Sequence, residues 1–460
     1  SQAKLTKILE KIDKLSEQKE LQFINHKVEE TLEGEGVEVK IKIFEGEKFI
    51  IEKINIAGNT VTNDSVIRGE LLVDEGDPYS ELLVNKSMNE IKARNIFGNV
   101  DFKTAEGSKD GYKILKISVE EKATGELMAG AGVGTEGTSV QMSISENNWL
   151  GRGVNLQSLV NLSEEKVNGN IAVTNPNYNF SGNSVRASLD VSSTDRSSTT
   201  GYKSSKTGFD LGTSFEQYEN IYIAPGLSIS HEDIKSEDSS SENIKKMDGT
   251  YFNSDFDYAL TLDKRDQRFQ PTEGYITTFR QSLPIIQDSS SIMNGFDISG
   301  YHDFSDDVIG SLKFYSRSMH GIDDDVRLTN RLYLPSKRLR GFVSGKVGPK
   351  DGDDFIGGNY AYSVNFASNI PQILEESQNV DFSVFADLAE IRGVDYNSSL
   401  DSDGIRSSIG LALDWFSPAG PMNFTLAYPI SKKNGDKTES FRFNLGTTFW
   451  WLDLKNYILY

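Results

Sequence analysis

The sequence has no cysteine and no long apolar run, and both absences narrow the possible folds. Zero cysteines among 460 residues exclude disulfide bonds and thiol chemistry. No stretch approaches the roughly 18 consecutive apolar residues of a membrane-crossing helix, so a transmembrane helix is excluded. A membrane β-barrel stays possible, because the alternating residues of its strands average to a modest hydropathy.

Basic residues are outnumbered by acidic ones, 48 to 68, and there are four histidines. These numbers bear on nucleic-acid binding and on metal binding. The net charge is −20, which argues against a nucleic-acid partner. The four histidines lie far apart without the spacing of metal ligands, and the acidic run 323–325 is better explained as a solvated loop than as a calcium site. No phosphate-binding loop, dinucleotide fingerprint or nucleophile elbow is present. We therefore expect no enzymatic activity, no metal and no cofactor.

What the chain does have is glycine, aromatic residues and alternation. It contains 40 Gly, 25 Phe, 18 Tyr and 4 Trp, a mixture typical of many strands joined by turns. From about Gly125 onward we count sixteen alternating segments, an even number, as a closed antiparallel barrel requires. A large soluble β-sandwich or a propeller is the alternative, although no repeat of blade length favours the propeller. The segments are 127–133, 140–145, 154–162, 168–173, 184–192, 207–214, 226–231, 250–262, 275–283, 296–304, 309–319, 359–366, 381–387, 407–415, 422–428 and 441–449.

The connections between these segments alternate in character. One set is short and structured, and the other is longer and polar. Short turns at one rim and long loops at the other are the expected polarity of an outer-membrane barrel. The short set includes 147–151, 175–178 and 417–421, and the long set includes 236–248, 287–291 and 395–403.

The first 46 residues predict an incomplete domain. Residues 1–18 place four apolar side chains at helical spacing, and residues 21–25 and 37–43 read as two strands joined by a turn at 34–36. A helix and a hairpin cannot close a core in so few residues. We therefore interpret residues 1–46 as the C-terminal part of a domain whose start is absent, with an N-terminus that is truncated or processed.

Residues 47–122 predict a complete domain of the order β-α-α-β-β. Thr62 or Asn63 can cap the first helix, which holds apolar residues from Val66 to Leu72. A generic small α+β domain is the alternative interpretation. The elements are expected at 49–56 (strand), 62–72 and 80–96 (helices), and 100–104 and 112–119 (strands).

A long loop at 322–355 separates two of the alternating segments. It carries Arg338, Arg340, Lys346 and Lys350 in a protein of strongly negative charge. A loop longer than about 15 residues is uncommon in a compact domain unless it is functional or disordered. A mobile surface loop is the simpler interpretation, and a functional loop is the other.

The first and last alternating segments must pair if the barrel closes. In the last, Phe441, Phe443, Leu445 and Phe449 share one face suited to lipid, and Arg442 should face the lumen. The first has three glycines on one face, which weaken a strand. The glycines either make room for a packed lumen or tight curvature, or they mark a weak edge that opens sideways and templates a client strand. These glycines are Gly130, Gly132 and Gly134.

Seven short motifs occur in a fixed order along the chain. They are Asn148–Gly151, Thr174–Pro176, Pro271–Gly274, Leu339–Phe342, Gly357–Asn359, Phe416–Pro421 and the last alternating segment. Together they resemble the BamA-like insertase family of the POTRA-plus-barrel superfamily. The resemblance implies a sixteen-stranded antiparallel transmembrane β-barrel (125–460) in the bacterial outer membrane, preceded by α+β POTRA domains in the periplasm, with 47–122 complete. It also implies that the protein inserts other barrels, with outer-membrane lipid, unfolded client barrels and periplasmic accessory lipoproteins as partners.

The resemblance also implies two sites. In the first, the loop folds back into the lumen as a latch, in which Arg340, Gly341 and Phe342 meet the wall at Asp387. A second acidic partner found in some members falls on Ala367 here, so a single carboxylate is expected. The second site is a lateral seam between the first and last strands. Its residues are Leu127, Gly130, Gly132, Gly134, Phe441, Phe443, Leu445, Gly446 and Phe449.

Alternatives within and outside this superfamily remain at this stage. One alternative is a secretion transporter, which uses the same kind of barrel to export a partner protein. A translocation module of the same superfamily is another. A passive porin is the third, and the domain at 47–122 argues against it, because porins have no POTRA domain. Residues 450–460 follow the usual end of such barrels and could extend the seam strand, lie at the membrane interface or form an accessory tail. The sequence leaves open the number of POTRA domains, the accessory subunits and whether the seam is open or closed.

Overall fold

The structure is a computed structural model and describes residues 24–33, 36–45, 49–238, 240–268, 270–305, 308–370, 380–417 and 420–446. The chain divides into two compact units. One comprises Ser1–Gly125 and Glu146–Asn155, and the other comprises Glu126–Ser145 and Leu156–Tyr460. None of the helices in the described ranges is long and apolar enough to cross a membrane. The expected helix at 1–18 and the segment 450–460 lie outside the described residues.

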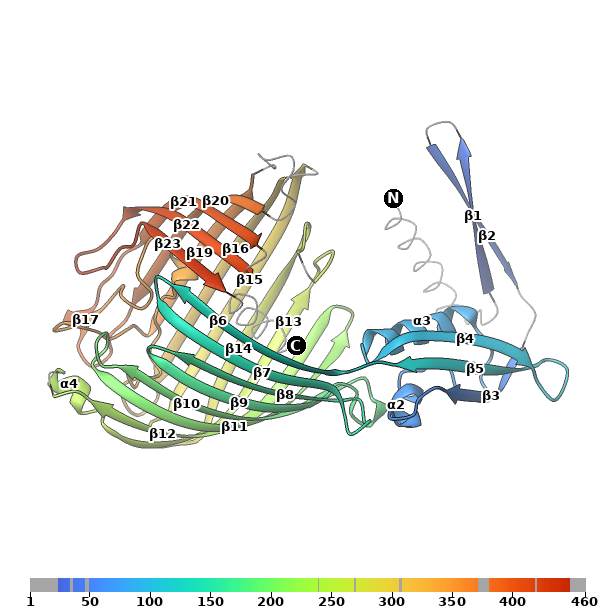
Figure 1. Cartoon of the computed structure of the whole chain (residues 1–460). Helices are drawn as coiled ribbons and strands as arrows, with labels where there is room; N and C mark the ends of the chain where they lie inside the picture. The colour runs from blue at the N-terminus through green and yellow to red at the C-terminus, as the bar shows by residue number, and fades with distance from the viewer. Residues whose placement is uncertain are drawn as a thin grey trace. The chain divides into compact units, whose positions relative to one another are not determined.

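The first unit contains a three-stranded sheet packed against helices. The strands lie in the order β3-β5-β4, with β3 parallel and β4 antiparallel to β5 (Figure 1). Buried apolar side chains from the sheet and both helices form one core, which includes Ile54, Ile67, Met88 and Leu115. The order β-α-α-β-β expected from the sequence is therefore confirmed. The elements are β3 (Ile50–Ala57), α2 (Asp64–Arg68), α3 (Glu81–Ala93), β4 (Phe97–Glu106) and β5 (Tyr112–Glu121).

The first helix of this domain is shorter than the sequence predicts. It ends at Arg68, with Gly69 as its C-cap, so Leu71 and Leu72 lie beyond it. Asn63 occupies the N-cap position, but its side chain makes no capping hydrogen bond. The prediction extended the helix because Leu71 and Leu72 are apolar residues that follow Val66 and Ile67. In the structure Leu71 does pack against the same core as Val66, but from beyond the helix. Burial alone therefore does not distinguish a further helical turn from a loop that covers the core.

A separate hairpin precedes this domain. Strand β1 (Ile24–Glu33) pairs antiparallel with β2 (Gly36–Glu45), from Ile24 opposite Glu45 to Glu33 opposite Gly36. The first strand runs on to Glu33 instead of ending near residue 25. Six of the eight added residues are polar, and Val28 and Leu32 are the two apolar ones. Period-2 alternation does not reveal a strand with so few apolar residues.

The second unit is a closed barrel of sixteen strands, and each sequential neighbour with a described register is antiparallel (Figure 1). Each of the sixteen predicted segments overlaps a different strand, so the predicted barrel is confirmed. Residue 359 falls just before β19, and 447–449 lie outside the described residues. The strands are β6 (Gly125–Gly134), β7 (Gly137–Trp149), β8 (Val154–Ser163), β9 (Lys166–Asn175), β10 (Ser184–Arg196), β11 (Tyr202–Tyr218), β12 (Ile221–Ser236), β13 (Gly249–Asp263), β14 (Gly274–Gln287), β15 (Ser291–Ser305), β16 (Val308–Gly321), β19 (Tyr360–Asn369), β20 (Val380–Arg392), β21 (Arg406–Ser417), β22 (Gly420–Ser431) and β23 (Phe441–Gly446).

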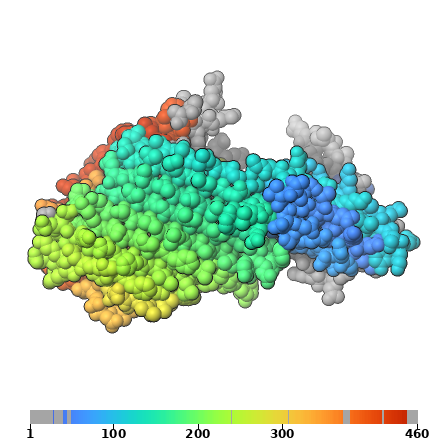
Figure 2. Space-filling view, turned by 60° about the horizontal axis from the view of Figure 1, so that its bottom comes forward, coloured from blue at the N-terminus to red at the C-terminus, as the bar shows by residue number. Residues whose placement is uncertain are grey.

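The two faces of the barrel wall differ in chemistry. On β20, the side chain of Asp387 is fully buried while its neighbour Leu388 is 47% exposed, because successive residues point to opposite faces. Neighbouring strands of the barrel are hydrogen-bonded to one another, and Figure 2 shows one face of the outer surface that they form. Large apolar residues exposed along the strands include Leu189, Val191, Phe209, Leu211, Leu227, Ile229, Phe256, Leu312, Leu388 and Leu411. An exposed apolar wall of this extent is typical of a barrel surrounded by lipid.

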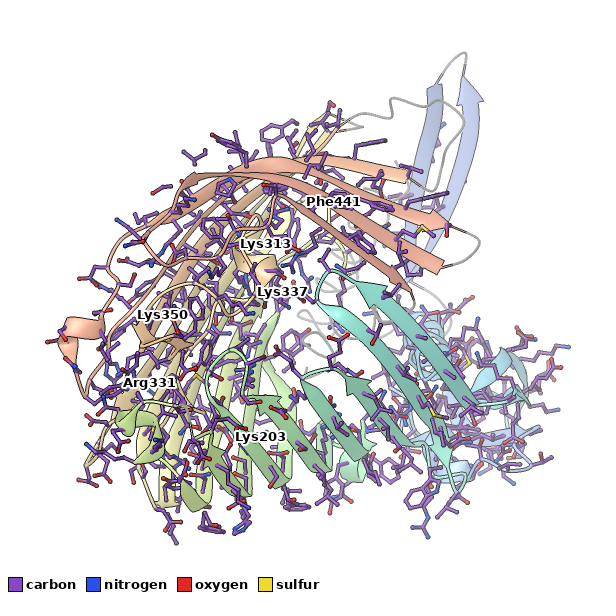
Figure 3. The ribbon with its side chains drawn as sticks, turned by 60° about the vertical axis from the view of Figure 1, so that its left-hand side comes forward. Lys203, Lys313, Arg331, Lys337, Lys350 and Phe441 are labelled. Atoms are coloured by element: carbon purple, nitrogen blue, oxygen red, sulfur yellow. The ribbon has the colours of Figure 1, made fainter. Side chains whose placement is uncertain are left out.

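The connection between β16 and β19 is the long loop predicted from the sequence. Two of its lysines, Lys337 and Lys350, are labelled in Figure 3. The loop is not structureless: it contains the 3-10 turn η2 (Ser336–Arg338) and a small hairpin of β17 (Lys350–Asp351) and β18 (Asp354–Phe355). The chain rejoins the wall as a strand at Tyr360, where β19 begins.

Candidate functional site

Arg340 of the long loop binds the inner wall of the barrel at Asp387. Its Nε donates to Asp387 Oδ2 at 2.8 Å and its Nη2 donates to Oδ1 at 2.7 Å, a bidentate pair. The main-chain amide of Arg340 adds a third hydrogen bond, to Oδ2 at 3.0 Å. The planar guanidinium matches the two oxygens of a carboxylate, so the pair fixes direction as well as charge.

Two further wall residues complete the surroundings of this ion pair. Asn365 of β19 donates to Asp387 Oδ1 at 2.8 Å and also to the carbonyl of Arg338 at 2.9 Å. The guanidinium of Arg340 lies 3.6 Å from the ring centroid of Phe385, a cation–π contact. The sequence analysis did not single out either residue. Asn365 could have been found from its alternation in Tyr360–Asn369, which places it on the inner face.

Gly341 and Phe342 bring the loop close to the wall. Gly341 has a φ of +88°, and a Cβ atom at this position would lie 3.0 Å from Ala427 Cβ. Phe342 is buried to 1% exposure in a cluster that joins the loop to β19 and β20. The cluster comprises Leu334, Leu339, Phe342, Val347, Ala361, Ala389 and Ile391.

A second anchor holds the loop two residues before Arg340. Arg338 Nη2 lies 3.5 Å from Asp297 Oδ1 on β15. Asp297 also accepts hydrogen bonds from Arg280 and Arg317, at 2.7 and 2.6 Å. The guanidinium groups of Arg338 and Arg317 both lie against the ring of Tyr315, 4.4 and 4.5 Å from its centroid.

Arg340 itself pairs with one carboxylate, Asp387. Other residues of the loop meet further carboxylates: Arg338 meets Asp297, Arg331 meets Asp395 and Arg327 meets Glu232. Ala367 offers no charge, as the sequence indicates, but Asp297 supplies a second carboxylate from a different strand. The sequence analysis missed this contact because Asp297 lies in a strand distant from the other wall residues. Its position on the inner face of Ser291–Ser305 was the available signal.

The seam pairs the first barrel strand, β6, with the last, β23. Within the described residues, β23 has five paired positions with β22 and three with β6. The three pairs at the seam are Asn444 with Gly134, Leu445 with Val133, and Gly446 with Gly132. An additional hydrogen bond runs from the amide of Thr135 to the carbonyl of Phe443, at 3.1 Å.

Gly134 allows the two strands to approach closely. A Cβ atom on Gly134 would lie 2.4 Å from Asn444 Oδ1 and 2.7 Å from the carbonyl oxygen of Phe443. The side chain of Asn444 thus uses the space that a larger residue would occupy. This geometry supplies a packing reason for Gly134, one of the three glycines that the sequence places on one face of this strand.

The predicted seam residues do not all meet. Gly132, Gly134, Leu445 and Gly446 are at the paired positions. Leu127 and Gly130 lie on β6 outside the three pairs. Phe441 and Phe443 pair with Leu426 and Phe424 of β22, and their rings stack at 6.1 Å. Phe449 lies outside the described residues.

The motif Asn148–Gly151 belongs to the first unit, where it binds the domain before the barrel. Asn148 donates to the Thr62 hydroxyl at 2.9 Å and accepts from the amide of Gly153 at 2.8 Å. The amide of Asn63 donates to the carbonyl of Gly151 at 2.8 Å. The motif is thus a connecting turn whose polar groups are satisfied within the first unit.

Both the barrel and the domain before it match known protein families. The profile of the Omp85 superfamily domain matches residues 148–449, and a POTRA profile, described as a surface antigen variable number repeat, matches residues 49–122. The outer membrane protein assembly factor BamA of Neorickettsia risticii is 28% identical over 429 residues, which cover 90% of this chain and 57% of the relative. The chain spans little more than half the length of the curated relatives it matches.

Solved structures share the fold. BamA from Haemophilus ducreyi, lacking POTRA domains 1–3, superimposes with a TM-score of 0.78 at 23% identity, over 92% of this chain and 89% of that one. CdiB from Escherichia coli gives a TM-score of 0.58 at 14% identity, over 92% and 80% of the two chains.

Proposed function

The chain belongs to the Omp85 superfamily, and on that premise we propose that it is part of a bacterial outer-membrane protein assembly factor. In this proposal the sixteen strands span the outer membrane and the β-α-α-β-β domain lies in the periplasm. Relatives that carry the name of this factor match nine-tenths of the chain. The apolar side chains exposed on the outer wall suit a lipid environment.

The domain division follows the same proposal. Residues 47–122 form a complete POTRA domain, and residues 125–460 form the barrel with its docked loop at 322–355. Residues 1–46 form the C-terminal part of a preceding POTRA domain, of which the hairpin β1–β2 is the described portion. Accessory lipoproteins of the assembly complex would bind the POTRA domains in the periplasm.

The observation that carries the proposed function is the glycine-rich pairing at the seam. Three residue pairs join β6 to β23 in the described part of the chain, and three of their six residues are glycines, Gly132, Gly134 and Gly446, which have no side chain to pack across the seam. An opened seam presents an unpaired strand edge, and a client strand can pair with it through main-chain groups whatever its sequence. The assembly factor then lowers the barrier to insertion without covalent chemistry, cofactor or metal.

The long loop acts as a latch in this mechanism. Arg340 binds Asp387, Gly341 permits the close approach, and Phe342 fills the space against the wall. A docked loop keeps the inner wall of β19 to β22 in one arrangement while the lipid-facing side and the seam receive client and lipid. The anchor at Asp297 gives the latch a second point of attachment.

A reversible lock of the seam tests the function. Val133 and Leu445 are directly opposed, and the chain has no other cysteine, so Val133→Cys with Leu445→Cys creates one thiol pair across the seam. Cross-strand Cα distances in antiparallel pairs suit a disulfide. We expect oxidation to stop the insertion of newly made outer-membrane barrels in cells that depend on this variant, and a reductant to restore it.

The matched control places the same thiols away from the seam. Phe314→Cys with Val364→Cys joins β16 and β19, which are also directly opposed. Oxidation of this pair should leave insertion unchanged. If many unrelated barrels still insert when the seam is locked, the proposed function is wrong. If depletion of the protein removes a single exported client instead, the chain is a secretion transporter.

A further inference from the structure

The last strand of the barrel makes contacts beyond its ladder with the first strand. In the described part of β23, Phe441–Gly446, the last three residues pair with β6. Each cross-strand pair contributes less than roughly 1 kcal/mol, so contacts outside the ladder also matter to closure. The residues just before β23, and the side chain of Arg442 within it, supply further contacts.

The segment 437–439 is hydrogen-bonded along its backbone to the latch. The amide of Glu439 donates to the carbonyl of Gly341 at 2.9 Å, and the amide of Val343 donates to the carbonyl of Lys437 at 3.0 Å. The amide of Lys437 in turn donates to the carbonyl of Lys346, also at 3.0 Å. The latch therefore serves as a short antiparallel partner for the chain that leads into the last strand.

Arg442 connects three parts of the barrel through one guanidinium group. Its Nε and Nη2 donate to Glu439 Oε2 at 3.0 and 2.6 Å. Its Nη1 donates to Glu136 Oε1, in the turn after β6, at 2.6 Å. Its Nη2 also reaches the carbonyl of Phe342, in the latch, at 3.4 Å. The last strand, the turn between β6 and β7 and the latch thus meet at Arg442.

The guanidinium group of Arg442 is suited to binding these three acceptors together. The side chain of Arg442 is 11% exposed, and its five donors in a planar fork can serve several acceptors at once. A lysine would offer one compact charge in place of the fork. Thr425 of β22 is the residue opposite Arg442 and carries no charge, so it does not compete for the guanidinium.

We propose that Arg442 is a positioning residue that couples docking of the latch to closure of the seam. When the latch is docked, the Phe342 carbonyl and Glu439 orient the guanidinium of Arg442. The guanidinium then holds Glu136, and with it the β6–β7 hairpin, beside the last strand. When the latch leaves the wall, the orientation is lost and the seam weakens. This inference rests on the proposed function, because it concerns regulation of the same seam.

An independent anchor makes the test specific. Asp436 and Arg406 form a pair of hydrogen bonds at 3.0 and 3.3 Å, with side chains exposed to 1% and 0%. Asp436 also accepts from the amide of Gly348 at 3.1 Å. These contacts hold the loop before β23 whether or not Arg442 is present. Loss of Arg442 should therefore change the seam without releasing this loop.

The experiment measures seam closure directly in the purified full chain, reconstituted in lipid without client. The rate of disulfide formation between Val133→Cys and Leu445→Cys reports how often the strands are paired. Arg340→Ala and Arg442→Gln should each lower this rate by about two- to fivefold, as expected for the loss of a partly exposed ion pair. The double variant should be no slower than the slower single variant, because both act through one connection.

Several controls separate coupling from general damage. The pair Phe314→Cys with Val364→Cys should form its disulfide at an unchanged rate in every variant. Arg392→Gln, at the end of β20, removes an exposed arginine elsewhere and should not change the seam. Arg442→Lys, which keeps the charge, should give an intermediate rate and replaces Arg442→Gln if that variant does not fold.

Two results would overturn the inference. One is an unchanged seam rate in Arg442→Gln, and the other is a double variant whose loss is the product of the two single losses. Neither result depends on insertion activity. If the coupling is found but a locked seam still inserts clients, the proposed function fails and the coupling stands.

Discussion

Asp387 receives Arg340 on both of its oxygens, from the guanidinium and from the main-chain amide of the same residue. This relationship joins β20 to the long loop across 47 positions of sequence. Both the side chain and the backbone of Arg340 are therefore fixed, and the next two residues of the loop are placed as a consequence. Several expected outcomes can be derived from this geometry.

Asp387→Ala should release the latch. Asp387 is fully buried, so its removal leaves the Arg340 guanidinium without a carboxylate in a low-dielectric site. Loss of one partner of a buried pair costs about 3–5 kcal/mol, and the cost here should lie at or below that range because Arg340 is 20% exposed. We expect faster hydrogen exchange over residues 335–345. Asp381→Ala, an exposed carboxylate on the same strand, is the control, and equal exchange in both variants would contradict this role.

Gly341→Ala should disturb the latch more than Gly345→Ala. Both glycines have positive φ, +88° and +69°, so both substitutions carry a conformational cost of roughly 1–2 kcal/mol. A Cβ at position 341 would also lie 3.0 Å from Ala427, whereas nothing lies within 4 Å of one at position 345. The difference in thermal unfolding between the two variants measures the close approach to the wall. Equal destabilisation would mean that only the backbone conformation matters.

Asp297→Asn should cost more than Arg338→Ala. Asp297 neutralises guanidinium groups from Arg280, Arg317 and Arg338, which would repel one another without it. Removal of Arg338 leaves Asp297 paired with the other two, and a 3.5 Å ion pair that is partly exposed is worth about 1 kcal/mol or less. Unfolding temperatures of the two variants test this order. A larger effect of Arg338→Ala would show that the second anchor outweighs the arginine cluster.

Acid should loosen the turn after β3 in the first unit. Burial raises the pKa of Glu121, but hydrogen bonds from Thr60, Thr62 and Val61 outweigh it and lower the pKa from 4.5 to about 2. The carboxylate therefore stabilises the fold above pH 4.5, and this stabilisation is lost as the pH falls from 4.5 towards 2. We expect the amides of Val61 and Thr62 to lose protection in that window.

The matched pair for this test is Glu121→Gln and Glu120→Gln. Glu121→Gln should show weak protection at every pH, with no further loss on acidification, because the carboxylate that titrates is gone. Glu120 is exposed on the other face of β5, so Glu120→Gln should retain the acid response of the parent chain. An acid response that survives in Glu121→Gln would assign it to a different group.

Prediction from the sequence was most successful for the barrel strands, where apolar and polar residues alternate regularly. Period-2 alternation located all sixteen strands and assigned Arg442 to the polar face, because every strand has one apolar and one polar side. It was less successful where two structures bury the same residues. Leu71 packs on the core from a loop after α2 ends at Arg68, and no periodicity distinguishes this from another helical turn.

The candidate site was only partly readable from the sequence. Arg340 and Asp387 followed from the resemblance to a known family, but Asn365 and Asp297 did not. Each is an ordinary inward-facing polar residue, and many such residues line the barrel. Which of them meets the loop depends on where the loop enters the lumen, and the sequence does not state that position.

The sequence by itself determined the strands, their two faces and the presence of a charged loop, because these depend on residues close together along the chain. The tertiary structure alone decided which charges meet. Arg442 and Glu136 are 306 positions apart, and they meet only because sixteen strands close and bring the last beside the first. Barrel closure fixes the register of distant strands through the sum of all their ladders. The contacts of the latch and the seam are therefore properties of the closed barrel.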